Sequence, residues 1–353
     1  MRILVTGGAG FVGSNLARTL KRDRPNDQIV ALDNLQRRGS ELALANLAEA
    51  GVDFVHGDVR CWEDLEGVGR VQLVLDCSAE PSVQAGYAGG ARPLIDTNLG
   101  GTVHCLELAR KNDAPLVFQS TSRVYPIDAL RALPLAEAKE RLVIPDGASG
   151  PGWSQAGIAA AFGGTGSRSL YGATKLCSEL LAAEYTAIYG VPVVTNRCGV
   201  IAGPGQLGRV DQGFVALWAA RHLWGGALAY RGFGGRGLQV RDVLHVADLY
   251  DLVSQQIASI EDHAGVIYCV GGGPERSVSL RELTRMCADR TEDELEIGSN
   301  PETHPSDVPF YVTDTRDVTA RTGWSPTRSV EMVLDDVFAW LRNGEAALRP
   351  LLA

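Results

Sequence analysis

The chain has 353 residues, 45% of them hydrophobic, and its 33 Lys and Arg against 42 Asp and Glu give a net charge of −9. This composition supports a substantial core, and the negative charge argues against an extended nucleic-acid-binding surface. The seven cysteines form no C-x-x-C pair, so neither a zinc site nor a disulfide scaffold is indicated. The chain opens without a signal-like leader, and no apolar run approaches the ~20 residues that span a bilayer. We therefore expect a cytoplasmic protein with reduced thiols, no membrane or nucleic-acid partner and no metal.

Strand and helix patterns alternate through the first 200 residues. The β-branched run RILVT at residues 2–6 is followed by glycines and then by SNLARTLKRD, whose apolar residues recur at helical spacing. Further strand-like runs are QIVALD, VDFVHGDV, VQLVLDCSA, PLVFQST and VPVVTNRCG, with helical stretches between several of them. This alternation predicts an α/β fold with a Rossmann-type doubly wound parallel sheet.

Two regions depart from that alternation. The segment at about residues 126–168 is long and rich in glycine and proline, and a connection of this length often forms a functional lid or a wall of a site. Beyond residue 200 the elements become shorter and less regular. We expect a first domain over residues 1–200 and a smaller irregular carboxy-terminal subdomain over residues 201–353, with a soft boundary that the chain crosses more than once.

The motif TGGAGFVG follows the first strand and precedes the first helix. Its Gly7, Gly10 and Gly13 allow a tight turn and close approach of the backbone to a pyrophosphate, which the helix amino terminus would bind. Asp33 ends the second strand, twenty residues after the last glycine, where its carboxylate can accept hydrogen bonds from a ribose. The alternative is a strand-to-helix turn without a ligand. With Asp33 included, the pattern indicates a dinucleotide site.

Charges near the second and third strands bear on which dinucleotide binds. The charge of Asp33 would repel a 2′-phosphate and so favours NAD over NADP, whereas Arg37 and Arg38 weaken that preference. Asp58, in GDVR after the third strand, is placed to reach the adenine edge or else is a turn residue.

The stretch SLYGATK places Tyr171 four residues before Lys175, so the two side chains share one helix face. A tyrosine has an unperturbed pKa near ~10 and needs nearby positive charge to act as a base at neutral pH. Lys175 and an oxidised nicotinamide would supply that charge, and Tyr171 would then take a proton from a substrate hydroxyl as hydride leaves the same carbon. The alternative is an amphipathic helix face with a lysine that reaches solvent.

Such a site needs another donor for the reacting oxygen, and QSTSRVY offers Ser120, Thr121 and Ser122. Together with the glycine turn, Y-x-x-x-K and VRDVLHVADL, this cluster resembles the extended short-chain dehydrogenase/reductase family, specifically its NAD-dependent nucleotide-sugar epimerases and dehydratases. The resemblance covers nearly the whole chain. It implies that Thr121, Tyr171 and Lys175 are catalytic. For Ser120 and Ser122 the alternative to a role in the site is that they are strand-end hydroxyls that bond to the backbone.

The resemblance also implies which residues bind a tightly held NAD that is regenerated in each turnover. Asn98 matches a position that organises the site, although an Asn helix cap is an alternative, and Cys198 would approach the nicotinamide or else be a small buried residue. The full set implied is Gly7, Gly10, Phe11, Val12, Gly13, Asp33, Asn34, Asp58, Val59, Ser78, Ala79, Asn98, Tyr171, Lys175 and Cys198.

For the nucleotide sugar, the resemblance assigns Arg241 to the diphosphate, for which guanidinium donors are suited. Asp211 and Arg209 lie near the expected nucleotide, and each of these positions is otherwise an exposed loop residue. His245 is expected to support its loop. The implied substrate set is Glu80, Thr121, Ser122, Gln206, Gln212 and Arg241. The first domain would then bind NAD and the second the nucleotide sugar.

The residues after Thr121 bear on the reaction. The dehydratase branch has Asp-Glu there because elimination of water needs a further acid and base, whereas this chain has Ser122 and Arg123. Dehydration is therefore disfavoured. Within the family the chain is most similar to the CDP-tyvelose 2-epimerase (CDP-paratose 2-epimerase) branch, in FVHGDVR, VDQGFVALW, GRGLQVRDVLH and VTDTRDVTARTGWSP. The resemblance implies inversion at carbon 2 of a CDP-hexose through a transient keto-sugar.

Two other functions remain open at this point. One is a UDP-sugar 4-epimerase, since neither spacing nor composition distinguishes carbon 2 from carbon 4. The other is an NAD-binding sensor or scaffold without turnover, against which the complete Thr, Tyr and Lys set argues. The resemblance further implies a homodimer formed through the helices in GGTVHCLELARK and ATKLCSELLAAEYTAIY.

Overall fold

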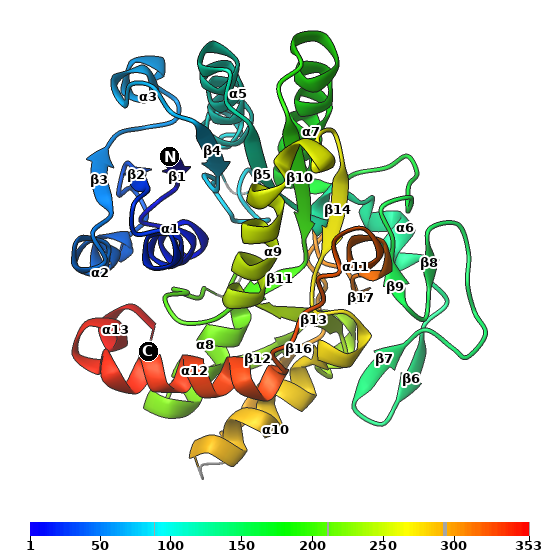
Figure 1. The fold of residues 1–353 in the computed structure, drawn as a ribbon. Helices are drawn as coiled ribbons and strands as arrows, with labels where there is room; N and C mark the ends of the chain where they lie inside the picture. Colours follow the sequence, from blue (N-terminus) through cyan, green and yellow to red (C-terminus); the bar gives the residue numbers. More distant parts are fainter. Residues whose placement is uncertain (88, 210–211, 292–294, 353) are drawn as a thin grey trace. The chain divides into compact units, whose positions relative to one another are not determined.

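The computed structural model describes residues 1–87, 89–209, 212–291 and 295–352 (Figure 1). Its contacts divide the chain into two compact units, each assembled from three segments. The first unit comprises Met1–Val124, Leu170–Arg197 and Tyr250–Tyr268. The second comprises Tyr125–Ser169, Cys198–Leu249 and Cys269–Ala353.

A seven-stranded sheet forms the centre of the first unit, in the order β14-β10-β5-β4-β1-β2-β3. Neighbours pair in parallel, as in the register of Arg2 with Gln28 and of Ile3 with Leu73. The strands are β1 (Arg2–Thr6), β2 (Gln28–Asp33), β3 (Asp53–His56), β4 (Leu73–Asp76), β5 (Leu116–Thr121), β10 (Val193–Cys198) and β14 (Ile267–Val270). The predicted Rossmann-type doubly wound sheet is confirmed.

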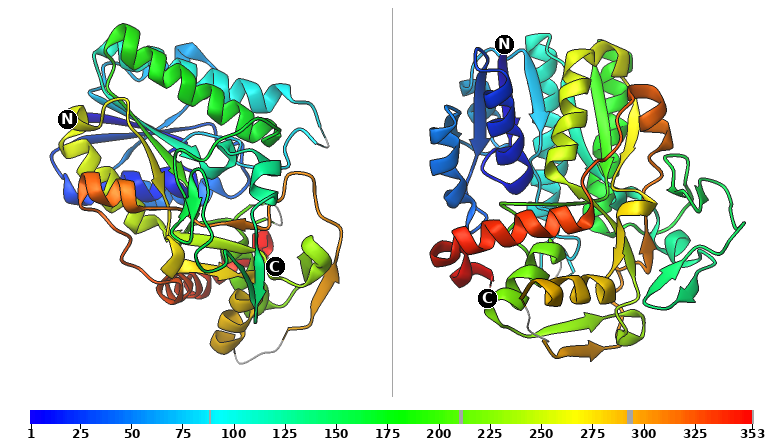
Figure 2. Two further views of the ribbon diagram at one scale, coloured as in Figure 1. Left: turned by 90° about the vertical axis from the view of Figure 1, so that its right-hand side faces the viewer. Right: turned by 60° about the horizontal axis from the view of Figure 1, so that its bottom comes forward.

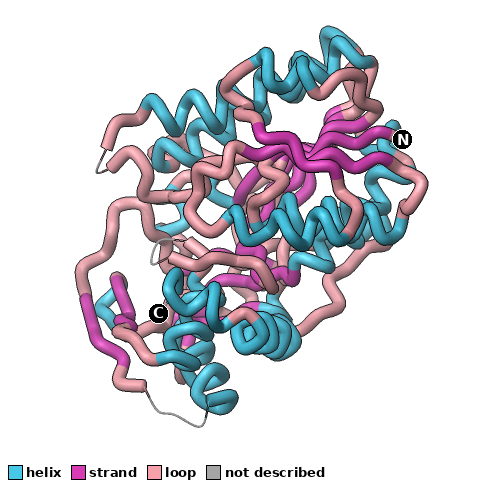
Figure 3. Tube along the Cα trace, turned by 90° about the vertical axis from the view of Figure 1, so that its left-hand side faces the viewer, coloured by secondary structure: helices cyan, strands magenta, loops and turns pink. Residues whose placement is uncertain are grey.

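Helices cover both faces of this sheet, which is why its strands are almost continuously apolar. Helices α5 and α7 lie on one face and α1 and α9 on the other (Figure 2), and Figure 3 shows helices on both sides of the strands. On the α5 and α7 face, Leu4, Val74, Leu106 and Phe118 belong to one buried cluster. The helices are α1 (Phe11–Asp23), α2 (Ala43–Glu49), α3 (Trp62–Gly67), α4 (Arg92–Ile95), α5 (Gly101–Asn112), α7 (Ser169–Tyr189) and α9 (Val246–Ala258).

The strand order reverses at β1, which pairs with β2 on one side and with β4 on the other. In sheets of this kind, ligands bind outside the carboxyl ends of the strands at the reversal. Gly7 follows β1, Asp33 ends β2, Asp76 ends β4 and Thr121 ends β5, so all four positions lie along one edge of the sheet.

The second unit is built on a smaller sheet of β11 (Val200–Ala202), β13 (Val240–His245), β15 (Ser277–Ser279) and β17 (Phe310–Tyr311). Strands β12 (Leu228–Arg231) and β16 (Ile297–Asn300) form a separate parallel pair. The helices are α6 (Ile127–Arg131), α8 (Phe214–Trp224), α10 (Leu280–Thr291), α11 (Arg316–Thr322), α12 (Val330–Asn343) and α13 (Glu345–Leu352). Val215, Leu283, Val333 and Phe338 contribute to its core.

The long segment after β5 is ordered and belongs to the second unit. It contains two hairpins, β6 (Ala136–Ala138) with β7 (Arg141–Val143), and β8 (Trp153–Ser154) with β9 (Gly157–Ile158). Ile158 is fully buried, its N–H donates to the Val312 carbonyl at 2.7 Å, and its own carbonyl accepts from Asp314 N at 3.0 Å. Within the described ranges, no helix has the length and apolar character needed to cross a membrane.

Candidate active site

The glycine turn is closed so tightly that side chains do not fit at Gly7, Gly8 or Gly13. Gly7 has φ of +61°, and a Cβ on it would lie 2.8 Å from the Cys77 carbonyl oxygen. A Cβ on Gly13 would lie 2.2 Å from the Gly7 carbonyl oxygen. Helix α1 begins after Gly10 with no side chain capping its amides, so its amino terminus suits an anion. The cradle fits the pyrophosphate of a dinucleotide.

Asp33 braces this turn from the end of β2. Its Oδ2 accepts a hydrogen bond from Ala9 N at 3.1 Å and its Oδ1 accepts one from Leu35 N at 2.8 Å. A carboxylate has about four lone-pair sites, so both oxygens keep acceptor capacity for a ribose hydroxyl. Phe11 and Val12, in the first turn of α1, are half-buried.

Asp58 is held by its own neighbours. Arg60 Nη2 donates to its Oδ2 at 2.5 Å, and Asn34 Nδ2 donates to the same oxygen at 2.9 Å. The hydrogen bonds from Arg60, and then from Asn34, lower the pKa of Asp58 to about 2, so the carboxylate is charged at neutral pH. The Val59 side chain is buried in the core, and the Val59 carbonyl accepts from His104 Nδ1 at 2.8 Å. Asn34 and Asp58 therefore form one fixed polar edge beyond Asp33.

Asp76 is a buried carboxylate that the sequence analysis missed. Its Oδ1 accepts from Thr6 Oγ1 at 2.8 Å and from Ser78 Oγ at 2.7 Å, and its Oδ2 accepts from Thr102 Oγ1 at 2.9 Å. It thus ties the end of β1, the loop after β4 and helix α5 together beside the glycine turn. The signal in the sequence was an acidic residue at the end of the apolar run LVLD, which is wholly buried. A buried carboxylate needs several hydrogen-bond donors, so such a residue indicates a polar cluster.

Asn98 organises the loop that follows Ser78 and the half-buried Ala79. It lies in a π-helical turn over Asp96–Gly100, where its Oδ1 accepts from Glu80 N at 2.8 Å and its Nδ2 donates to Glu80 O at 3.2 Å. These bonds reach another segment of the chain, so the helix-cap alternative is wrong. The side chain of Glu80 itself is exposed.

Thr121 ends β5, and Tyr171 and Lys175 lie one turn apart on α7. All three are buried, with 8%, 9% and 2% of their surface exposed. Lys175 Nζ donates to the Gln119 carbonyl at 3.0 Å and lies 4.5 Å from the centre of the Phe118 ring. The lysine is thus anchored to the strand that ends in Thr121.

The two serines beside Thr121 have different surroundings. Ser122 is half-buried in a 3₁₀ turn, and Thr121 Oγ1 accepts from the Arg123 N–H at 3.2 Å. Ser120 donates to the carboxylate of Glu179 at 2.5 Å, so its expected bond to the backbone is wrong. The reason is that α7 brings a buried acid against β5, which spacing along the sequence does not reveal.

Arg241 lies on β13 of the second unit and is already ion-paired. Its Nη2 lies 2.9 Å from Asp307 Oδ1 and donates to the Val308 carbonyl at 2.6 Å, and Nη1 donates to the Val240 carbonyl at 2.8 Å. The guanidinium is therefore oriented before any ligand binds. His245 accepts from Ala247 N through Nδ1 at 2.9 Å and contacts Asp336 through Nε2. It ends β13 directly before α9, so it contacts helices α9 and α12 and not the expected loop.

The other second-unit candidates lie near strand ends and in a loop. Cys198, the last residue of β10, is buried, and Gln206 is buried with its Nε2 donating to the Ile201 carbonyl at 2.8 Å. Gln212 is half-buried and pairs through its backbone with Arg209. Asp211 lies outside the described residues.

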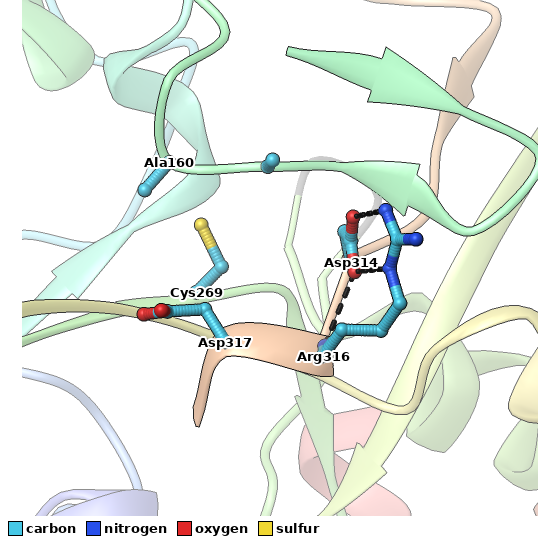
Figure 4. Close-up of a pocket in the computed structure, with 6 residues that line it drawn as sticks. Ala160, Cys269, Asp314, Arg316 and Asp317 are labelled. Atoms are coloured by element: carbon cyan, nitrogen blue, oxygen red, sulfur yellow. Dashed lines mark hydrogen bonds and ion pairs between the residues drawn. The ribbon is translucent and has the colours of Figure 1, made fainter. Parts of the chain in front are cut away.

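A pocket of about 280 Å³ in the second unit contains none of the predicted site residues (Figure 4). Its charged groups are paired, Arg316 with Asp314 at 2.6 Å and Asp317 with Arg321 at 3.0 Å. The lining residues are Ala159, Ala160, Cys269, Asp314, Arg316 and Asp317.

Comparisons with known proteins place this site in a family. A model described as "NAD dependent epimerase/dehydratase family" matches residues 3–271. The CDP-paratose 2-epimerase of Salmonella typhi is 28% identical over 347 residues, which cover 96% of this chain and 99% of the relative.

Two solved structures are similar over nearly their whole length. The dTDP-glucose 4,6-dehydratase of Streptomyces venezuelae, solved with NAD bound, is 28% identical with a TM-score of 0.78, covering 99% of this chain and 100% of that one. The UDP-glucose 4-epimerase of Thermus thermophilus in complex with NAD is 26% identical with a TM-score of 0.78, covering 97% and 99%.

Proposed function

Because the chain belongs to the NAD dependent epimerase/dehydratase family, and is therefore an NAD-dependent enzyme, we propose that it is an NAD-retaining nucleotide-sugar epimerase that inverts carbon 2 of a CDP-hexose. The observation that carries the proposal is the buried set of Thr121, Tyr171 and Lys175 on β5 and α7 of one unit. The likeness to CDP-paratose 2-epimerase over 96% of the chain supports the choice of carbon and nucleotide.

In the proposed mechanism, Tyr171 takes the proton of the sugar hydroxyl and later returns it. Lys175, buried and anchored to Gln119, lowers the cost of the phenolate, and the Thr121 hydroxyl donates a hydrogen bond to the reacting oxygen. NAD, when bound, would supply the hydride acceptor for oxidation of the sugar carbon and the hydride donor for its re-reduction on the opposite face. Burial of the three side chains excludes water from the exchange.

Cofactor binding is proposed for the remaining residues at the edge of the sheet. The uncapped amino terminus of α1 and the turn at Gly7 would hold the pyrophosphate, and Asp33 would bind the adenosine ribose. Asn34 and Asp58 would line the adenine side, and Cys198 would approach the nicotinamide. In this proposal residues 1–200 form the NAD-binding domain and residues 201–353 bind mainly the nucleotide sugar.

The substrate diphosphate would bind Arg241, whose guanidinium is held by Asp307 and two carbonyls. A pre-oriented guanidinium loses little entropy when it binds a phosphate. Gln206 and Gln212 would contact the nucleotide, and Glu80 and Ser122 the sugar.

Epimerisation is favoured over dehydration by the residues that follow Thr121. Ser122 and Arg123 provide no carboxylate, and the Arg123 N–H already donates to Thr121 Oγ1. Elimination of water needs an acid and a base beside the tyrosine. A UDP-sugar 4-epimerase is the second candidate, because the Thermus thermophilus enzyme of that activity is 26% identical over 97% of this chain.

The proposed acid and base role is tested with Tyr171→Phe. This change removes the phenolic oxygen and keeps the ring, so the variant should retain bound NAD but lose turnover of a CDP-hexose, measured by NMR of the product. Full activity of Tyr171→Phe would remove the proposed base. A protein that binds NAD but turns over none of a panel of CDP-, UDP- and dTDP-hexoses would instead be a sensor or scaffold.

The proposal also includes a homodimer and a cytoplasmic location. Supporting the dimer, α7 carries an exposed stripe of Cys177, Leu180 and Ile188 at helical spacing, with Leu180 62% and Ile188 65% exposed. Supporting the location, all seven cysteines are free thiols.

A further inference from the structure

A buried ion pair between α7, the helix that carries Tyr171 and Lys175, and β10 has no role in the mechanism described above. Glu179 of α7 is 3% exposed, and its Oε2 lies 2.7 Å from Arg197 Nη2 of β10. Arg197 Nε also donates to both carboxylate oxygens, at 3.1 and 3.0 Å. The Ser120 hydroxyl of β5 donates to Glu179 Oε1 at 2.5 Å. One carboxylate therefore joins three elements of the first unit.

The contact between Glu179 and Ser120 lies beside a second one. Lys175, one turn earlier on α7, donates to the carbonyl of Gln119, the strand residue just before Ser120. Residues four apart on a helix share a face and lie ~6 Å apart along the axis. Two such contacts to consecutive strand residues restrict both rotation and sliding of α7 against β5, whereas one contact would leave rotation free.

This register bears directly on the candidate catalytic residues. Thr121 follows Ser120 on the strand, and Tyr171 lies one turn before Lys175 on the helix. A shift of α7 along β5 would therefore move the Tyr171 hydroxyl relative to that of Thr121. Apolar side chains would pack the same space at no loss of stability, because a buried ion pair barely recovers its desolvation cost. The directional contacts of Glu179 with Ser120 and Arg197 instead fix the position of α7 on β5.

We propose that Glu179 is a positioning residue that sets the register of α7 on β5, with Ser120 as its contact on the strand and Arg197 as the group that orients its carboxylate. The inference rests on the proposed function, in which Thr121 and Tyr171 act on the same sugar oxygen. Glu179 itself touches neither the substrate nor the cofactor.

Glu179→Gln tests the inference in the NAD-bound protein. The amide keeps the shape but replaces one carboxylate oxygen with an NH2 donor and removes the charge, so it cannot accept from both Nε and Nη2 of Arg197 while it also accepts from Ser120. Because a misplacement of about 1 Å costs on the order of a hundredfold in rate, we expect kcat to fall by about ten- to a hundredfold. KM for the nucleotide sugar and the NAD content of the folded protein should change by less than about twofold, since both binding surfaces remain.

Two further variants make the test specific. Ser120→Ala removes the contact on the strand and leaves the ion pair in place, so it should lower kcat even if Glu179→Gln folds poorly. The double variant that combines Ser120→Ala with Glu179→Gln should be no slower than Glu179→Gln alone. Glu107→Gln is the matched control, since Glu107 of α5 contacts α7 through Tyr185 and should leave kcat unchanged. Normal kcat in the folded fraction of both Ser120→Ala and Glu179→Gln would overturn the inference.

A measurement without substrate separates this inference from the proposed function. Hydrogen exchange of the peptide containing residues 119–121 should be faster in Glu179→Gln than in wild type, and unchanged in Glu107→Gln. Equal exchange in wild type and Glu179→Gln would overturn the register claim. If wild type turns over no nucleotide sugar, the proposed function fails and the exchange result alone decides whether Glu179 sets the register.

Discussion

At the scale of single residues, the glycine turn allows the sharpest prediction. A Cβ at Gly13 would lie 2.2 Å from the Gly7 carbonyl oxygen, whereas one at Gly67 would meet nothing within 4 Å. Overpacking costs about 1–3 kcal/mol, so Gly13→Ala should lower NAD affinity by about ten- to a hundredfold. Titration calorimetry of the cofactor-stripped protein measures this, with Gly67→Ala as the control. Equal affinity of both variants would show that the turn does not hold the cofactor.

Asp242 on β13 gives a pH prediction. Complete burial raises the pKa of its carboxyl, despite the hydrogen bond that its Oδ2 accepts from Gly273 N at 3.2 Å. A raised folded-state pKa means that the native state binds the proton more tightly, so stability is lost as pH rises from the unfolded value of about 3.9 through the folded value. Asp242→Asn cannot ionise and should escape this loss.

The measurement for Asp242 is the melting temperature of wild type and Asp242→Asn between pH 4 and 7. The melting temperature of Asp242→Asn should increase relative to that of wild type as pH rises. A difference that is constant over the range, or that falls with pH, would contradict a raised pKa of Asp242 in the native state.

At the scale of elements, Asp248 fastens the start of α9 to the loop before α12. Its carboxylate accepts from Thr327 Oγ1 at 2.9 Å and lies 2.6 Å from Arg328 Nη1, while its carbonyl accepts from Trp324 Nε1 at 3.0 Å. The carboxylate is 1% exposed. Removing one member of a buried pair leaves an unpaired charge, so Asp248→Ala should cost about 3–5 kcal/mol of unfolding free energy.

Urea unfolding measures that cost, and Asp317→Ala is the control. Asp317 pairs with Arg321 at 3.0 Å but is 58% exposed, so its loss should cost less than about 1 kcal/mol. Similar values for the two variants would mean that the Asp248 contacts add little stability.

The sequence predicted elements well where one local pattern determines them. RILVT, QIVALD and PLVFQST form the expected strands β1, β2 and β5, because runs buried on both faces are mostly apolar. Contacts between distant segments could not be predicted in this way. Ile158 N donates to the Val312 carbonyl, and Glu179 accepts from Ser120. Asp76 accepts from Thr6, Ser78 and Thr102. No spacing along the chain predicts these partners.

At the scale of the whole molecule, the exposed stripe on α7 predicts self-association. Leu180→Glu places a charge where two apolar stripes would meet, so it should convert a dimer to a monomer in sedimentation velocity at micromolar concentration. Met332→Glu is the control, because Met332 is 50% exposed on α12, outside the stripe. A wild-type protein that sediments as a monomer would contradict the proposed homodimer.

The central claim is that hydride leaves carbon 2 of the sugar and returns to the same carbon on the opposite face. NMR of the product formed from a CDP-hexose with deuterium at carbon 2, without added NAD, tests this most directly. The account predicts inverted configuration at carbon 2 with the deuterium still on that carbon. Inversion at carbon 4 with carbon 2 unchanged, loss of water from the sugar, or no reaction would contradict it.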